Sequence, residues 1–92
     1  MKSATTERFR KAFAALPKDI QERARKAYTL WKQDNFHPSL HFKQVHKEQA
    51  IYSVRVGLSY RALGVIQGDA IIWFWIGSHE DYNNLLSKYK NL

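Results

Sequence analysis

Residues Tyr52 to Tyr82 decide the fold of this chain, and they read YSVRVGLSYRALGVIQGDAIIWFWIGSHEDY. Three apolar runs are separated here by glycine-containing breaks, which is typical of strands joined by turns. The pair Gly68-Asp69 predicts a two-residue hairpin between the second and third runs. The third run is apolar on both faces, so we expect its strand to be central or covered on both sides.

Alternating apolar and polar residues predict the bounds of the strands. The predicted strands cover residues 40–45, 50–56, 60–67 and 70–76, the first with the weakest pattern. In the second strand, Ile51, Ser53 and Arg55 are expected on the face opposite Tyr52, Val54 and Val56.

Two amphipathic helices precede the strands. Thr5 or Thr6 caps the first, whose apolar residues fall at helical spacing, namely Phe9, Ala12, Phe13 and Leu16. Pro17 ends this helix and starts a second, over residues 17–33, with apolar residues Ile20, Ala24, Ala27, Tyr28 and Trp31. The short connection predicts an antiparallel hairpin that buries both apolar stripes against the sheet.

A third helix is predicted at the end of the chain. Ser78 and Asp81 are spaced as in a capping box, and the apolar residues that follow are Tyr82, Leu85, Leu86 and Tyr89. The sequence therefore predicts an α+β fold in which an N-terminal antiparallel helical hairpin packs on a three- to four-stranded antiparallel sheet, with a short C-terminal helix. We expect residues 1–92 to form a single domain.

The composition narrows the classes of function. The chain has 92 residues, no cysteine and a formal net charge of +7, so disulfides and thiolate metal sites are excluded. No run has the length of a membrane span, and we expect a cytoplasmic protein without membrane contacts. Residues 1–32 carry nine positive and three negative side chains, which suits an anionic partner or simply a solvated surface.

Two arginines lie inside predicted strands, where a guanidinium needs a partner or access to solvent. Arg61 is expected at the rim of a concave surface, where it can bind phosphate oxygens or stabilise a phosphorane transition state. Arg55 has the same interpretation, and Lys43 and Lys47 would extend the positive surface. The alternative for Arg61 is a structural salt bridge to Glu48, Glu80 or Asp81.

His79 is expected at a strand-to-helix junction, where an exposed imidazole can act as general acid or base. A capping or packing role is the alternative. Tyr82 lies three residues later, so both side chains are expected on one side of the helical turn. Without cysteine or matched acidic ligands the remaining histidines support a metal site only weakly, and we expect none at His37, His41 and His46.

Together these motifs resemble the RelE/ParE superfamily of type II toxin–antitoxin toxins. The resemblance is carried by Tyr52–Val56, Tyr60–Leu63 and Trp75–Tyr82, with a helical hairpin from Phe9 and an entry to the sheet at Leu40. It implies two helices packed on an antiparallel sheet, often after a leading strand. Because the residues before Glu7 are few and polar, we expect that strand to be short or absent.

The resemblance implies a toxin that a cognate acidic antitoxin inhibits. Many RelE-like members cleave mRNA in the ribosomal A site without a metal, so no cofactor is expected. On that reading Arg61 stabilises the phosphorane, His79 transfers protons and Tyr82 stacks on a base or orients the site. Lys43, Lys47 and Arg55 would hold the RNA backbone.

One departure from the nuclease pattern keeps other activities open. Nuclease members with this histidine often have tyrosine directly after it, whereas here Glu80 and Asp81 intervene and bring two negative charges. ParE-like members inhibit DNA gyrase instead. A gyrase-binding toxin and a toxin-like domain without catalytic activity are therefore the alternatives to an mRNA endoribonuclease.

Overall fold

The computed structural model describes the backbone of residues 1–90 and the side chains of residues 1–88. The elements are β1 (Lys2–Thr5), α1 (Glu7–Ala14), α2 (Lys18–Gln33), the 3₁₀ helix η1 (Pro38–Leu40), β2 (Lys43–Gln44), β3 (Ile51–Val56), β4 (Tyr60–Gln67), β5 (Ala70–Ser78) and α3 (His79–Lys90). The predicted contribution of Tyr89 to the last helix lies outside the described side chains. No helix within residues 1–90 combines the length and apolar character needed to cross a bilayer.

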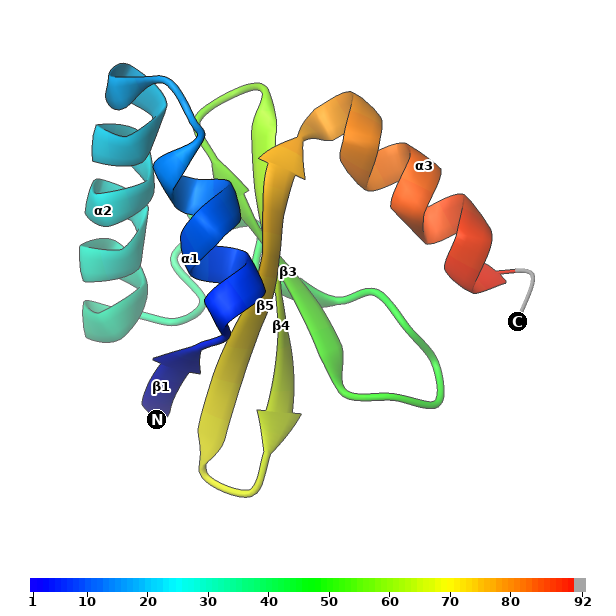
Figure 1. Ribbon diagram of the computed structural model, residues 1–92. Coiled ribbons are helices and arrows are strands. Elements are labelled where there is room, and N and C mark those ends of the chain that lie inside the picture. Colours follow the sequence, from blue (N-terminus) through cyan, green and yellow to red (C-terminus); the bar gives the residue numbers. More distant parts are fainter. Residues whose placement is uncertain (91–92) are drawn as a thin grey trace.

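The five strands form one mixed sheet in the order β1-β5-β4-β3-β2. β1 runs parallel to β5, and the other neighbouring pairs are antiparallel. The helices α1 and α2 run in opposite directions over one face, and α3 lies on the other side of the sheet (Figure 1). The predicted α+β fold with its N-terminal hairpin is present, but the prediction of three or four strands, all antiparallel, was wrong.

β1 is the leading strand that the sequence analysis expected to be short or absent. It is short but present, and it is held by backbone hydrogen bonds from Lys2 N to Asp69 O and from Thr6 N to Trp73 O, each 3.0 Å long. Such bonds need no apolar side chain, so hydropathy carries little signal for this strand. Because β1 and β4 pair with its two sides, β5 is an interior strand with both faces covered, as its two apolar faces predicted.

Local backbone conformation explains why the predicted start of α1 is correct and why the strand predicted over residues 40–45 is shorter than expected. Thr6 caps α1 by accepting a hydrogen bond from Phe9 N at 3.1 Å. The strand predicted over residues 40–45 shrinks to the two residues of β2, because η1 precedes it and His41 adopts a left-handed conformation with φ 47°. The extended conformation therefore begins only after His41.

A β-bulge in β5 changes which residues face each side of the sheet. Leu63 pairs with Trp75 and Gly64 pairs with Trp73, so Phe74 is an extra residue in the ladder. Trp73 consequently packs in the core under α1 and α2, while Phe74 and Trp75 both pack in the smaller core around Ile51, Leu63 and Tyr82. Simple alternation from Trp73 onward would place Trp75 on the helical hairpin's side.

Gly64 opposite the bulge leaves space for two large neighbours. A Cβ atom at Gly64 would lie 2.7 Å from Ile71 Cγ1 and 2.8 Å from Trp73 Cε3. Ile71 has no exposed surface and Trp73 is 5% exposed, so neither side chain has room to move outward. The close packing of the helix-side core therefore requires glycine here.

We expect Gly64→Ala to lower the free energy of unfolding by about 1–3 kcal/mol, because the added methyl group overpacks the core. Urea denaturation measures the change. Gly68→Asn is the matched control, since asparagine tolerates the φ of +61° there and no atom lies within 4 Å of the position that its Cβ atom would occupy. Equal stability of the Gly64→Ala variant and the parent would contradict the packing described.

Candidate functional site

Two arginines face each other across neighbouring strands on the α3 side of the sheet. Arg55 of β3 is the direct register partner of Arg61 of β4. The Arg61 guanidinium donates to Tyr60 O at 2.8 Å, and Arg55 Nε donates to Gly57 O at 3.1 Å. Arg55 Nη1 also lies 3.3 Å from His41 Nε2. Backbone carbonyl groups therefore hold both guanidinium groups in place.

Neither arginine has a carboxylate partner among the described side chains. The ion pairs of this part of the chain lie elsewhere, at Lys2–Asp69, Lys11–Glu7 and Lys26–Glu22. The salt bridge considered for Arg61 as a structural alternative is thus not formed within residues 1–88.

Electrostatics at Arg61 favour an anionic ligand. Burial lowers the pKa of Arg61, the positive charge of Arg55 lowers this pKa further, and Tyr82 acts in the opposite direction. An anion that contacted both guanidinium groups would supply the missing negative charge and reduce their mutual repulsion. The pair therefore presents positive charge that no carboxylate among the described side chains offsets.

The start of α3 brings His79 to the same end of the sheet. Gly77 pairs with Arg61, and His79 follows two residues later. Its amide donates to Ser59 O at 2.7 Å, which ties α3 to the turn between β3 and β4. Ser78 caps the helix by accepting from Asp81 N at 3.1 Å. The backbone of His79 therefore lies at the same end of the sheet as the arginine pair, and its side chain is exposed.

Tyr82 points into the protein rather than outward. It is 7% exposed, and its hydroxyl donates to Ser53 Oγ at 3.5 Å. Its ring centroid lies 6.0 Å from that of His79, as the helical spacing predicted. Burial favours the orienting role for Tyr82 over stacking on a base.

The two lysines differ in their placement. Lys43 pairs with Ser53, so it shares the face of the arginines and is exposed. Lys47 is exposed in the loop that enters β3, whereas Arg55 lies near the other end of that strand. The structure thus brings Lys43 onto the face of the site and places Lys47 at a distance.

The other three histidines make separate local contacts. His37 Nδ1 lies 2.8 Å from Ser39 Oγ, His41 contacts Arg55, and His46 Nδ1 accepts from the amides of Glu48 and Gln49. No group of three side chains suited to bind a metal is found in the part of the chain that is described.

Trp75 is a site residue that the sequence reasoning missed. A Cβ atom at Gly77 would lie 2.7 Å from Trp75 Cζ2, so the indole extends over the residue that pairs with Arg61. The indole is half-buried and packs beside Tyr82, with ring centroids 6.5 Å apart. The bulge that turns Trp75 to this face leaves no periodic signal in the sequence. A glycine two residues after the tryptophan, which leaves space for the indole, is the signal that could have indicated this arrangement.

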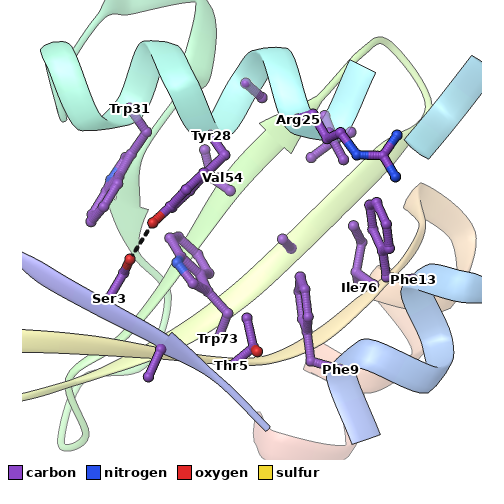
Figure 2. Close-up of a pocket in the computed structure, with 15 residues that line it drawn as sticks. Ser3, Thr5, Phe9, Phe13, Arg25, Tyr28, Trp31, Val54, Trp73 and Ile76 are labelled. Atoms are coloured by element: carbon purple, nitrogen blue, oxygen red, sulfur yellow. Dashed lines mark hydrogen bonds between the residues drawn. The ribbon is translucent and has the colours of Figure 1, made fainter. Parts of the chain in front are cut away.

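The opposite face of the sheet carries a groove between α1 and α2. This cavity has a volume of about 360 Å³, and its lining includes Phe9, Phe13, Ala24, Ala27, Trp31 and Trp73. Figure 2 shows the hydroxyl groups of Ser3 and Tyr28 joined by a hydrogen bond on one side, and Arg25 beside Phe13 on the other. The apolar stripes predicted to be buried are therefore only partly covered, and α1 has no fully buried residue.

We expect Arg61→Met to raise the free energy of unfolding by about 0.5–1 kcal/mol, because like charges directly opposite each other in a sheet destabilise it. Methionine keeps an apolar stem of similar length. Denaturant titration measures the change, and Arg8→Met, at an exposed position of α1, is the control. A loss of stability in Arg61→Met alone would instead indicate a structural role for Arg61.

Comparison with known proteins agrees with this architecture. A chain of the RelB–RelE antitoxin–toxin complex from Methanococcus jannaschii superimposes with a TM-score of 0.71 at 20% identity, covering 89% of this chain and 96% of that chain. YafQ from E. coli strain BL21(DE3) superimposes with a TM-score of 0.70 at 8% identity, and the match covers 88% of this chain and 96% of YafQ. A chain of the archaeal RelE–RelB complex from Pyrococcus horikoshii OT3 superimposes with a TM-score of 0.67 at 15% identity. This match covers 84% of this chain and 92% of that chain.

The sequence comparison is more specific than these structural likenesses, which at such low identities show the fold alone. No curated protein matches the sequence. Residues 18–84, most of the chain, match the profile of the ParE-like toxin domain. This chain therefore belongs to the ParE-like toxin domain family, within the RelE/ParE superfamily of toxins from toxin–antitoxin systems.

Proposed function

We propose that this toxin inhibits translation by cleaving mRNA on the ribosome, as a metal-independent endoribonuclease. The observation that carries the proposal is the pair Arg55 and Arg61, directly opposed and without a carboxylate partner among the described side chains. Guanidinium groups in this arrangement suit the oxygens of a phosphodiester. The nearby exposed His79 supplies a group that can transfer protons.

The reaction that fits these groups is attack by a ribose 2′-hydroxyl on the adjacent phosphorus. His79 accepts the hydroxyl proton or donates one to the leaving 5′-oxygen, and the P–O5′ bond breaks as the new P–O2′ bond forms. The products are a 2′,3′-cyclic phosphate and a free 5′-hydroxyl. Arg61 stabilises the additional negative charge of the phosphorane, and Arg55 and Lys43 hold the RNA backbone.

Cleavage of an mRNA on programmed ribosomes tests the proposal. We expect Arg61→Ala to slow cleavage by about 10²–10³-fold through loss of transition-state charge stabilisation. His79→Gln is expected to slow it by about 10²–10⁴-fold through loss of proton transfer. Arg8→Ala, at an exposed position of α1, is the matched control and should cleave like the parent.

A substrate with a 2′-deoxyribose at the cleaved position should resist the parent enzyme, because the attacking hydroxyl is then missing. Cleavage of that substrate, or full activity of folded Arg61→Ala, would contradict the mechanism. An intact mRNA with and without ribosomes would remove the nuclease proposal altogether.

A binding toxin that inhibits DNA gyrase is the second candidate. The observation that favours it is the acidic pair Glu80 and Asp81, exposed in the first turn of α3 directly after His79. Their charges oppose RNA near the arginine pair, whereas a protein surface with positive groups would accommodate them. Inhibition of gyrase supercoiling by a protein that leaves mRNA intact would favour this candidate.

We also propose that the groove between α1 and α2 binds an acidic, amphipathic segment of the cognate antitoxin. The floor of the groove is apolar, and Arg25 lies at its wall. Lys32 lies over the ring of Tyr28, and Arg10 donates to Thr5 O at 2.8 Å, so further positive charge borders the same opening. An apolar floor with a basic border matches a helix that has one apolar and one acidic face.

Ala27→Glu places a carboxylate in that groove and should weaken antitoxin binding by at least about 10-fold through burial and charge repulsion. Ala14→Glu, at an exposed position of α1, is the control. Isothermal titration with the antitoxin encoded beside the toxin gene measures both affinities. Equal affinities would exclude the groove, and a loss confined to Arg61→Met would place the antitoxin on the arginine face instead.

A further inference from the structure

We infer that Trp75 is a stacking platform that holds the base of a nucleotide next to the scissile phosphate. The inference rests on the proposed function, because it concerns how the arginine site holds RNA. It assigns the stacking role to a residue of β5 rather than to Tyr82, and it follows from the bulge, the exposure of the aromatic rings and the position of Gly77.

The bulge at Phe74 gives Trp75 its direction. Without the extra residue, Trp75 would share the face of Trp73 under the helical hairpin, but the structure packs it with the cluster around Leu63 on the α3 side. Trp75 pairs with Leu63, and Gly77 pairs with Arg61. Two residues along a strand span about 7 Å, a distance that one nucleotide bridges between its phosphate and its base.

The indole extends from Trp75 along its strand toward Gly77, the register partner of Arg61. Its Cζ2 and Cη2 atoms lie 2.7 Å and 2.9 Å from the position that a Cβ atom of Gly77 would occupy. The absence of a side chain at Gly77 therefore lets the ring lie along the sheet next to Arg61. Any other residue at position 77 would push the indole out of this place.

Exposure separates Trp75 from Trp73 and Tyr82, whereas Phe74 beside it is partly buried in the same way. Trp73 is 5% exposed and Tyr82 is 7% exposed, so neither ring offers a face to a base. Trp75 is only partly buried. Tyr82 supports it from the protein side, with ring centroids 6.5 Å apart and planes inclined by 41°. The indole of Trp75 thus packs against Tyr82 and is only partly buried, on the face of the sheet that carries the two guanidinium groups.

This arrangement predicts the class of ligand. Every nucleobase has an aromatic face, so stacking on an indole tolerates all four bases, and a positive surface beside it retains the backbone. We therefore assign to Trp75 a single-stranded RNA nucleotide with little selectivity for base identity. Because stacking requires an unpaired base, double-stranded RNA should not fit.

Binding of a short single-stranded RNA, 2′-O-methylated throughout so that it cannot be cleaved, tests the inference by fluorescence polarisation. Trp75→Leu should bind about 10-fold more weakly than the parent, since an aliphatic side chain packs but does not stack. Trp75→Phe should stay within about 3-fold, because it keeps an aromatic face. Phe74→Leu, at the neighbouring bulge residue, is the matched control and should bind like the parent.

An oligonucleotide with the same backbone and one abasic position separates stacking from general packing. If the abasic site falls at the stacked nucleotide, removing the base should lower the affinity of the parent for the RNA. The affinity of Trp75→Leu should not fall any further. The intrinsic fluorescence of the parent should be quenched by the intact RNA, and Trp75→Phe should lack this quenching. Circular dichroism verifies that the variants are folded.

These measurements distinguish the inference from the proposed function, because binding is followed without cleavage. Equal affinity of the parent and Trp75→Leu, absence of quenching, or the same abasic cost in both proteins at every position would overturn the stacking role. If mRNA is then still cleaved, the nuclease proposal remains. The opposite result is that mRNA is not cleaved, while the fluorescence is quenched and removal of the base weakens binding to the parent but not to Trp75→Leu. The stacking role then stands and the catalytic proposal falls.

Discussion

The pairing of β5 along both of its edges is the constraint on which the rest of the structure depends. β1 joins it in parallel and β4 in antiparallel, so the backbone groups of this apolar strand are satisfied without solvent. Side chains can then cover both of its faces. α1 packs against β5 on one face, and α3 continues directly from the end of β5 on the other. The groove and the arginine site consequently occupy opposite faces of the same sheet.

The arginine site illustrates how a small domain carries an unfavourable feature. Arg55 and Arg61 repel each other, and burial further disfavours the charged form of Arg61, as its lowered pKa indicates. Packing alone would favour apolar side chains at such positions. Two backbone carbonyl acceptors and the neighbouring core of Ile51, Leu63 and Tyr82 keep the arrangement in place. Two positive charges therefore stand opposite each other here without a compensating carboxylate among the described side chains.

The sequence predicted what depends on local periodicity and missed what depends on pairing between distant segments. β4 spans the predicted residues 60–67, and β3 has Arg55 on the predicted face. The parallel pairing of β1 is a backbone interaction of polar residues, so hydropathy does not report it. For the site, the sequence between Arg61 and His79 predicted the hairpin of β4 and β5, which brings these two residues to the same end of the sheet. The bulge that redirects Trp75 depends on the register between two strands, which no single stretch of sequence encodes.

The partial burial of α1 has a consequence for how stability is distributed in the free protein. This helix contributes no fully buried side chain, whereas β5 includes Ile71, Trp73 and Ile76 in the core. Elements with few buried apolar groups open at a lower free energy than the global unfolding reaction. α1 thus forms a locally labile element on a more persistent sheet, and any molecule that fills the groove shifts this opening equilibrium toward the closed state. Protection from proteolysis and occupancy of the groove are therefore coupled through one helix.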